Sequence, residues 1–103
     1  MPFKLLIVVN STGFRLDFAK KIAKAATDSR ADVGIVFVGN SLYSLRKRAC
    51  QSMKELEGVS LMAHEMSMAE RGVQYADLAE CAKIINDDEL LDLMISSEKT
   101  LCV

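Results

Sequence analysis

Short apolar runs alternate with amphipathic segments along this chain. Residues 4–9 form one run, which stops at the polar turn Asn10-Ser11-Thr12-Gly13, and residues 33–38 form a second, which stops at Gly39-Asn40. Runs this short and this apolar are typical of strands buried on both faces of a parallel sheet. The chain therefore opens as an α/β domain, in which the turn after the first strand marks the edge where ligands bind.

Three later segments complete the predicted sheet. Residues 59–63 and 99–103 predict a third and a final strand, and residues 73–78 predict a weaker strand between them. The pattern of 73–78 is poor, because its apolar positions do not alternate regularly.

The segment after the first turn has the pattern of a helix that faces a core. Phe14, Phe18, Ile22 and Ala26 recur at a spacing of four residues, with Ala19 and Ala23 alongside them in the stripe. This spacing places all four on one side of a helix, and we expect that side to pack on the sheet.

Further helices are predicted between the later strands. Apolar positions spaced by three and four from Leu42 to Leu56 predict a second helix that ends at Gly58, and residues 64–71 predict a short helix or loop. Asn86 followed three residues later by Glu89 is a capping box, so a last helix is expected from residue 87 to about residue 97.

Strands and helices in this order predict one domain over residues 1–103. The expected architecture is a three-layer α/β/α fold around a mostly parallel sheet of about five strands, of the flavodoxin-like or Rossmann-like topology class. A chain of 103 residues with half of its residues apolar is long enough for one core and too short for two.

Charge and composition limit the compartments and partners that are expected for this protein. The net charge of −1 gives no general attraction to nucleic acid, so nucleic acid is not expected as a partner. No apolar run approaches the length of a membrane helix, and Lys4 leaves no room for a signal peptide, so we expect a cytoplasmic protein with no membrane contact. Three widely spaced cysteines and one histidine favour free thiols, with no metal site and no cofactor.

Two elements at the predicted sheet edge are candidates for chemistry. The turn of Asn10, Ser11, Thr12 and Gly13 would bind an anion through backbone N–H groups at a helix N-terminus, or Ser11 or Thr12 would simply cap the helix. His64, at the end of the third predicted strand, would act as an acid, a base or a hydrogen-bond donor, or would only be a packed strand-end residue.

The cysteines have different expected roles. Cys81 lies two residues before Lys83, whose charge would favour a reactive thiolate, although a small buried side chain is the alternative. Cys50 and Cys102 are expected to be structural, because free cysteines are usually buried.

Three segments resemble the DsrE/DsrF/TusD family of small sulfur-relay proteins. They are residues 4–11 (KLLIVVNS), residues 69–73 (AERGV) and the tail from residue 77 to residue 103. The resemblance implies a three-layer α/β/α fold and assembly into dimers, trimers or hexamers. In active members, it also implies a cysteine that carries persulfide sulfur and precedes a short helix ending in Arg-Gly.

The family's spacing, counted back from Arg71-Gly72, places His64 where that cysteine would stand. The resemblance therefore implies a non-catalytic or binding subunit, homo-oligomeric or associated with related sulfur-relay proteins. One alternative is a sulfurtransferase that uses Cys81. Another is a flavodoxin-like nucleotide or flavin binder that uses the Ser11-Thr12-Gly13 turn.

Overall fold

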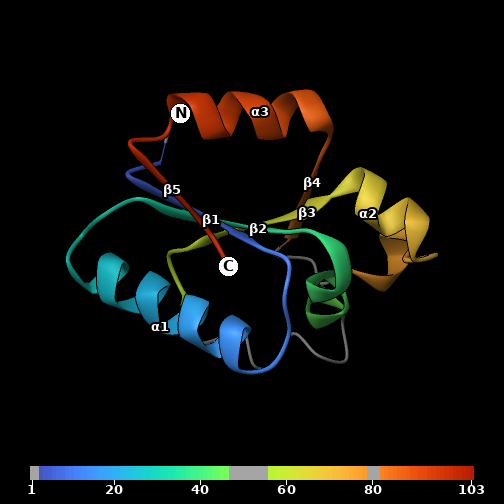
Figure 1. Cartoon of the computed structure of the whole chain (residues 1–103), viewed down its shortest axis with the longest axis horizontal. Coiled ribbons are helices and arrows are strands. Elements are labelled where there is room, and N and C mark those ends of the chain that lie inside the picture. Colours follow the sequence, from blue (N-terminus) through green and yellow to red (C-terminus); the bar gives the residue numbers. More distant parts are fainter. Residues whose placement is uncertain (1–2, 47–55, 79–81) are drawn as a thin grey trace.

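Five parallel strands form the centre of the protein, in the order β4-β3-β2-β1-β5 (Figure 1). The computed structural model describes residues 3–46, 56–78 and 82–103. The strands are β1 (Leu5–Val9), β2 (Val33–Phe37), β3 (Ser60–His64), β4 (Ala82–Ile85) and β5 (Lys99–Cys102). The predicted three-layer α/β class with a five-stranded parallel sheet is confirmed.

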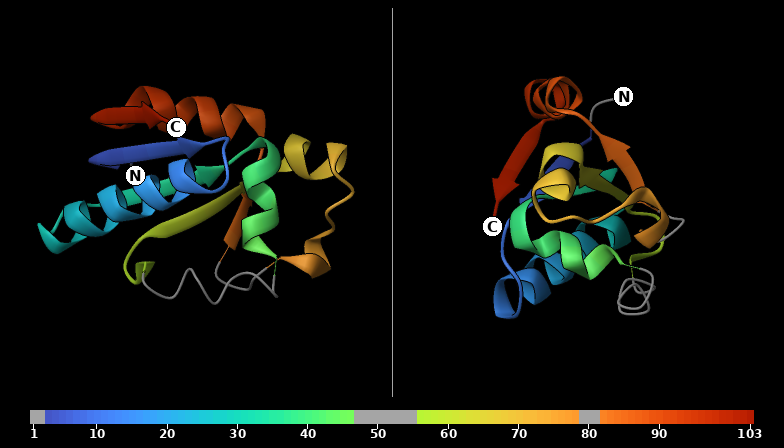
Figure 2. Two further views of the ribbon diagram at one scale, coloured as in Figure 1. Left: turned by 60° about the horizontal axis from the view of Figure 1, so that its bottom comes forward. Right: turned by 90° about the vertical axis from the view of Figure 1, so that its right-hand side faces the viewer.

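Helices lie on both faces of this sheet (Figures 1 and 2). Helix α1 (Phe14–Asp28) covers one face and α3 (Asp87–Ser96) crosses the other. Strands β1 to β4 follow one another in one direction across the sheet, and the chain then returns over the opposite face through α3 to place β5 beside β1. The helix changes face when the direction of travel reverses, as right-handed crossovers require.

Short helices gather beyond the carboxyl ends of the strands. They are the 3-10 helix η1 (Gly39–Leu45), helix α2 (Glu65–Glu70) and the 3-10 helix η3 (Tyr75–Asp77). Helix α2 packs on η1 and on β3. These elements enclose the end of the sheet where a ligand site is expected in α/β folds.

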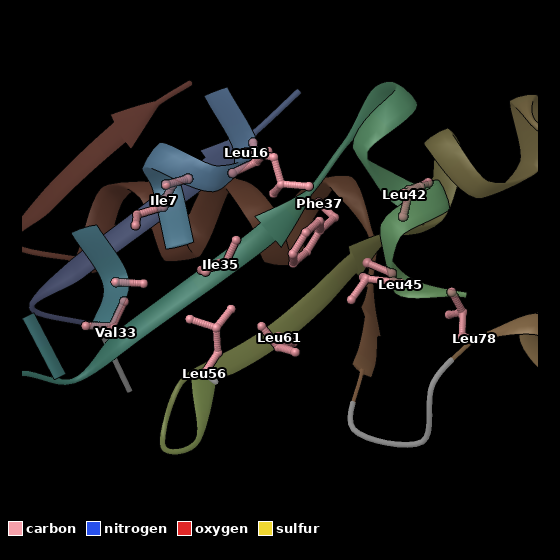
Figure 3. Close-up of a cluster of buried hydrophobic side chains, with 14 of the residues drawn as sticks. Ile7, Leu16, Val33, Ile35, Phe37, Leu42, Leu45, Leu56, Leu61 and Leu78 are labelled. Atoms are coloured by element: carbon pink, nitrogen blue, oxygen red, sulfur yellow. The ribbon is translucent and has the colours of Figure 1, made fainter. Parts of the chain in front are cut away.

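The main hydrophobic core lies between the sheet and α1 (Figure 3). Because side chains alternate along a strand, Ile7, Ile35 and Phe37 point to the α1 face, whereas Leu6 and Val36 point to the α3 face. The α3 face is covered more thinly, since α3 contributes only the partly buried Leu90 and Leu93 to the second cluster. That cluster consists of Leu6, Val36, Met62 and Ile85.

Helix α1 corrects the predicted core stripe. Its buried positions are Leu16, Ala19 and Ala23, whereas Phe14 is 93% exposed and Phe18 is also exposed. The predicted stripe is therefore right for Ala19 and Ala23 and wrong for Phe14 and Phe18, which lie on a second, outer apolar side of the helix. Small alanines face the sheet because they let the helix backbone approach it closely.

Two other segments differ from the prediction. Residues 73–78 contain η3 and not a strand; only Val73 and Leu78 of this segment are buried, and the fourth strand is β4. The predicted helix from Leu42 to Leu56 begins as the 3-10 helix η1, and its part from 47 to 55 lies outside the described residues.

Helix α3 confirms the capping-box prediction. The Asn86 side chain accepts a hydrogen bond from the Glu89 N–H at 2.9 Å, and the Glu89 carboxylate accepts one from the Asn86 N–H at 3.2 Å. The three acidic residues of its first turn also lie at the positive end of the helix dipole.

Candidate functional site

The candidate site lies at the carboxyl edge of the sheet. Asn10 follows β1, Gly39 follows β2 within two residues, His64 is the last residue of β3 and Asp87 follows β4 within two residues. Neighbouring parallel strands end side by side, so these four residues come from four different parts of the sequence to one edge.

His64 is held by hydrogen bonds at both ring nitrogens. Its Nδ1 lies 2.7 Å from the Ser67 hydroxyl oxygen, and its Nε2 lies 2.5 Å from Asp87 Oδ1. The His64 side chain is 14% exposed and the Asp87 side chain is 65% exposed. The imidazole therefore joins the β3–α2 turn to the first turn of α3.

The hydrogen-bond network defines which nitrogen carries the proton. The Asp87 carboxylate only accepts, so Nε2–H donates to it. The Gly39 N–H donates to the Ser67 oxygen at 3.1 Å, which leaves the Ser67 hydroxyl proton to donate to Nδ1 of a neutral imidazole. If the ring is protonated, Nδ1–H donates to Ser67 instead.

This arrangement contains serine, histidine and aspartate but is not a nucleophilic triad. Ser67 is buried, and its oxygen already takes part in two hydrogen bonds. A serine nucleophile must face the substrate with its oxygen next to an accessible base. The geometry suits a positioning network that fixes loops around a binding edge.

Gly39 connects this network to the turn after β1. A Cβ atom on Gly39 would lie 2.0 Å from Asn10 Oδ1, and the glycine has a φ of +58°. Only glycine combines this conformation with so close an approach. Contacts therefore run without a break along the edge from Asn10 through Gly39 and Ser67 to His64 and Asp87.

Arg71 supports the same region from the end of α2. Its Nε donates to Asn40 Oδ1 at 3.1 Å, and its Nη1 donates to the Ser67 carbonyl at 3.2 Å. The buried Ser41 hydroxyl lies 2.7 Å from the Val9 carbonyl and 2.8 Å from the Val38 carbonyl, between which its proton is shared. Both side chains tie the loop after β2 to its neighbours.

The structure corrects the expectation that Ser11 or Thr12 caps α1. The N-cap residue is Gly13, with φ 71° and ψ −134°, and no side-chain cap hydrogen bond is present among the described residues. The first described bond of this helix runs from the Asp17 N–H to the Gly13 carbonyl. The N–H groups of residues 14–16 thus point out of the helix end beside the Asn10–Gly13 turn.

The predicted cysteines do not share one environment. Cys50 and Cys81 lie outside the described residues. Cys102 is exposed on β5, so the prediction of a buried structural cysteine is wrong. It pairs in register with Val8, whose side chain lies on the α3 face of the sheet.

Two hollows lie near α3. A small one of about 310 Å³ is lined by Glu65, Met66 and residues 86–88, next to the His64–Asp87 contact. A larger groove of about 800 Å³ runs between α3 and strands β3 and β4. In the part of the chain that the structure describes, no three histidine, cysteine or acidic side chains come together to hold a metal ion.

Sequence reasoning identified His64 but not its partners. Ser67 lies three residues after His64, a spacing at which two side chains are neighbours on one side of a helical turn. Asp87 lies 23 residues away in sequence, and only the pairing of β3 with β4 brings it near. The sequence identified Asp87 only as one of the acidic residues in the first turn of α3, and not as a partner of His64.

Comparisons with known proteins give a fold and no family. No protein-family model matches the chain, and no curated protein sequence matches it significantly. The crystal structure of the YchN protein from Escherichia coli is similar over 100% of both chains, with a TM-score of 0.83 and 20% identity. The protein of unknown function MTH1491 from Methanobacterium thermoautotrophicum is similar over 96% of each chain, with a TM-score of 0.80 and 13% identity.

The structural similarity shows that the chain shares the fold of these proteins, which is the DsrE-like fold. Because the identities are low, it shows the fold alone. Among the described helices, none is both long and apolar enough to cross a membrane.

Proposed function

We propose that this protein is a small cytoplasmic DsrE/DsrF-like binding subunit related to sulfur relay, which carries no sulfur at the usual position. The chain works in a homo-oligomer or with related sulfur-relay proteins. Its DsrE-like fold and the resemblance of residues 69–73 support this proposal.

The state of His64 carries the proposal. The resemblance places this residue where active members hold the carrier cysteine, and here both ring nitrogens are already hydrogen-bonded. An imidazole held in this way positions neighbouring loops and has no free lone pair for attack on a sulfur donor. The position thus retains a structural role while the transfer chemistry is lost.

Exposure to a low-molecular-weight persulfide donor, followed by peptide mass spectrometry, tests the proposal. Apart from the exposed Cys102, which any small donor can reach, we expect no cysteine of the natural chain to gain the mass of one sulfur atom. A His64→Cys variant should gain it on residue 64, because a thiol there would stand next to the hollow lined by Glu65, Met66 and residues 86–88. His64→Ser is the matched control, since it removes the imidazole without supplying a thiol.

The persulfide experiment tests one alternative, and a titration with flavin tests the other. A stable persulfide on Cys81 of the natural chain would replace the proposal by a sulfurtransferase. Uptake of flavin with its visible absorbance would replace it by a flavodoxin-like binder.

The Asn10–Gly13 turn is the proposed ligand element of this subunit. The uncapped start of α1 offers N–H groups there, and such helix ends attract anions. Titration with inorganic phosphate and with thiosulfate should shift the amide resonances of residues 11–16 saturably. Shifts of equal size at both ends of α1 would indicate only non-specific ion effects and would remove this site.

A further inference from the structure

Strand β5 leaves one edge of the sheet open. It pairs with β1 on one side, and no described strand pairs with its other side. Natural proteins usually protect such edges with charges, prolines or bulges. Here Lys99 is the only charged residue of the strand, and Thr100, Leu101 and Cys102 follow it.

An exposed apolar stripe on α1 lies on the β5 side of that helix. Lys24 and Thr27 face the opposite side, because they line a hollow with Leu56 and Val59 at the start of β3. The helical repeat then turns the stripe toward β5. The α1 stripe consists of Phe14 and Phe18, both exposed, and the half-buried Ile22.

A second apolar stripe lies on the β5 side of α3. The other side of this helix faces β3 and β4, since Glu89, Asp92 and Ser96 line the groove there. The α3 stripe consists of Leu91, Met94 and Ile95, all exposed, with Ile95 at 81%. The Thr100 hydroxyl of β5 lies 3.5 Å from the Met94 carbonyl, which places this stripe next to the edge strand.

We propose that the β5 edge, with the α1 stripe on one face and the α3 stripe on the other, is the surface through which two copies of this chain form a twofold-symmetric dimer. Adjoining exposed apolar side chains beside an unpaired strand edge mark a protein–protein contact surface. Figure 2 (right) shows β5 at the side of the molecule, between the level of α3 and that of α1.

A second copy fits this surface because it covers the α1 stripe, the β5 edge and the α3 stripe at the same time. A lone peptide strand would pair with β5 but would leave both stripes exposed. Another copy, turned by a twofold axis perpendicular to the sheet, brings its own β5 between its own two stripes. The two sheets then join into one, with α1 beside α1 and α3 beside α3.

The backbone determines the register of this pairing. The N–H groups of Lys99 and Val103 donate to β1, at 3.2 Å to the Lys4 carbonyl and 2.9 Å to the Val8 carbonyl. Because these groups alternate in direction along a strand, those of Thr100 and Cys102 point outward. The antiparallel register that uses both outward residues of each strand sets Thr100 opposite Cys102 of the partner subunit, with the twofold axis at Leu101.

This inference gives a surface to the assembly included in the proposed function and otherwise does not depend on it. Charge substitutions in the stripes test it by analytical ultracentrifugation of the full chain. Phe18→Glu and Ile95→Glu should each raise the dimer dissociation constant by about 30-fold or more, as loss of a central contact does. Both side chains are exposed in the monomer, so the variants should fold.

Tyr75→Glu is the matched control. Tyr75 is 80% exposed and belongs to η3, after α2 on the far side of the sheet from β5. It should leave the dissociation constant unchanged. A natural chain that stays monomeric at high concentration, or a dimer that survives both stripe variants, would overturn the proposal.

Cross-linking tests the register itself in a Cys102→Ser background. Leu101→Cys places two thiols at the twofold axis, where opposite Cα atoms of an antiparallel pair are about 4.5–5.5 Å apart, within disulfide range. Lys99→Cys lies on the same strand and face, but its two copies would stand about 13 Å apart along the strand. We expect a reducible dimer for the first and little for the second; equal yields would refute this register.

Different results would refute the proposed function and the proposed interface. A persulfide on Cys81 would replace the binding-subunit function and leave the β5 interface intact. A monomeric natural chain would remove the interface and leave the result at His64 unaffected.

Discussion

The hydrogen bond between His64 and Asp87 should stabilise the protein by a measurable amount. Asp87→Ala removes the acceptor for Nε2–H and leaves the imidazole, which is only 14% exposed, without its partner on α3. Asp87→Asn keeps an acceptor oxygen and removes only the charge. The comparison of these two variants separates the hydrogen bond itself from the contribution of the carboxylate charge.

Exposure sets the size of the effect. A hydrogen bond to a charged group contributes about 1.5–3 kcal/mol when both partners are buried. The Asp87 side chain is 65% exposed, so water competes for it and about 1 kcal/mol is the expected loss. Asp87→Ala also removes a favourable charge at the helix N-terminus, which accounts for a further ~0.3–1 kcal/mol.

Asp88→Ala is the control for the helix contribution. Asp88 lies in the same first turn of α3 and makes no described contact with His64. In urea unfolding, Asp87→Ala should be less stable than Asp88→Ala by about 1 kcal/mol, with Asp87→Asn between them. In thermal melts this difference corresponds to roughly 4–8 °C for a domain of this size.

The reasoning fails if Asp87→Ala and Asp88→Ala unfold at the same urea concentration. The hydrogen bond would then contribute nothing, and His64 would not link β3 to α3. Unfolding of the double variant His64→Ala/Asp87→Ala closes a mutant cycle, in which a coupling energy near zero would also show that the two side chains do not stabilise each other.

Three further measurements test other parts of the structure. His64 is the only histidine, so the nitrogen resonances of its neutral form should report a proton on Nε2, and Ser67→Ala should alter the Nδ1 resonance; an Nδ1–H tautomer would contradict the assigned network. Phe37→Ala should destabilise the fold by about 3–5 kcal/mol in urea unfolding, because the ring is fully buried, whereas Phe14→Ala should change the stability of the monomer by less than about 0.5 kcal/mol; similar losses would mean that Phe14 packs in the core. Arg30→Gly should raise the free energy of unfolding by about 0.5–1 kcal/mol, since Arg30 has a φ of +66° just after α1; a destabilised variant would show that the arginine side chain has a role of its own.

The fold was largely predictable because its strongest signals are local. The runs of β1 and β2 are apolar at nearly every position since both faces of those strands are buried, and the capping box at Asn86 defines the start of α3. β4 was missed because it is only four residues long and carries Lys83 toward the groove under α3.

The remaining errors concern which side of an element is buried. The side of α1 with Phe14 and Phe18 is the more hydrophobic by sequence, yet the side with Ala19 and Ala23 packs on the sheet. Periodicity identifies an apolar side but cannot tell a core contact from a surface contact. The partner of His64 depends on the pairing of β3 with β4, which no local pattern contains.

The position of β1 has a consequence for how the chain is made. This strand pairs with β2, which follows it closely in the sequence, but its other neighbour is β5 at residues 99–102. The Phe3 N–H, for example, donates to a Ser97 hydroxyl 94 residues later. During synthesis, one side of β1 therefore stays unpaired until residues 99–102 have emerged, and a chain cut before residue 99 would leave this apolar strand as an unpaired, aggregation-prone edge.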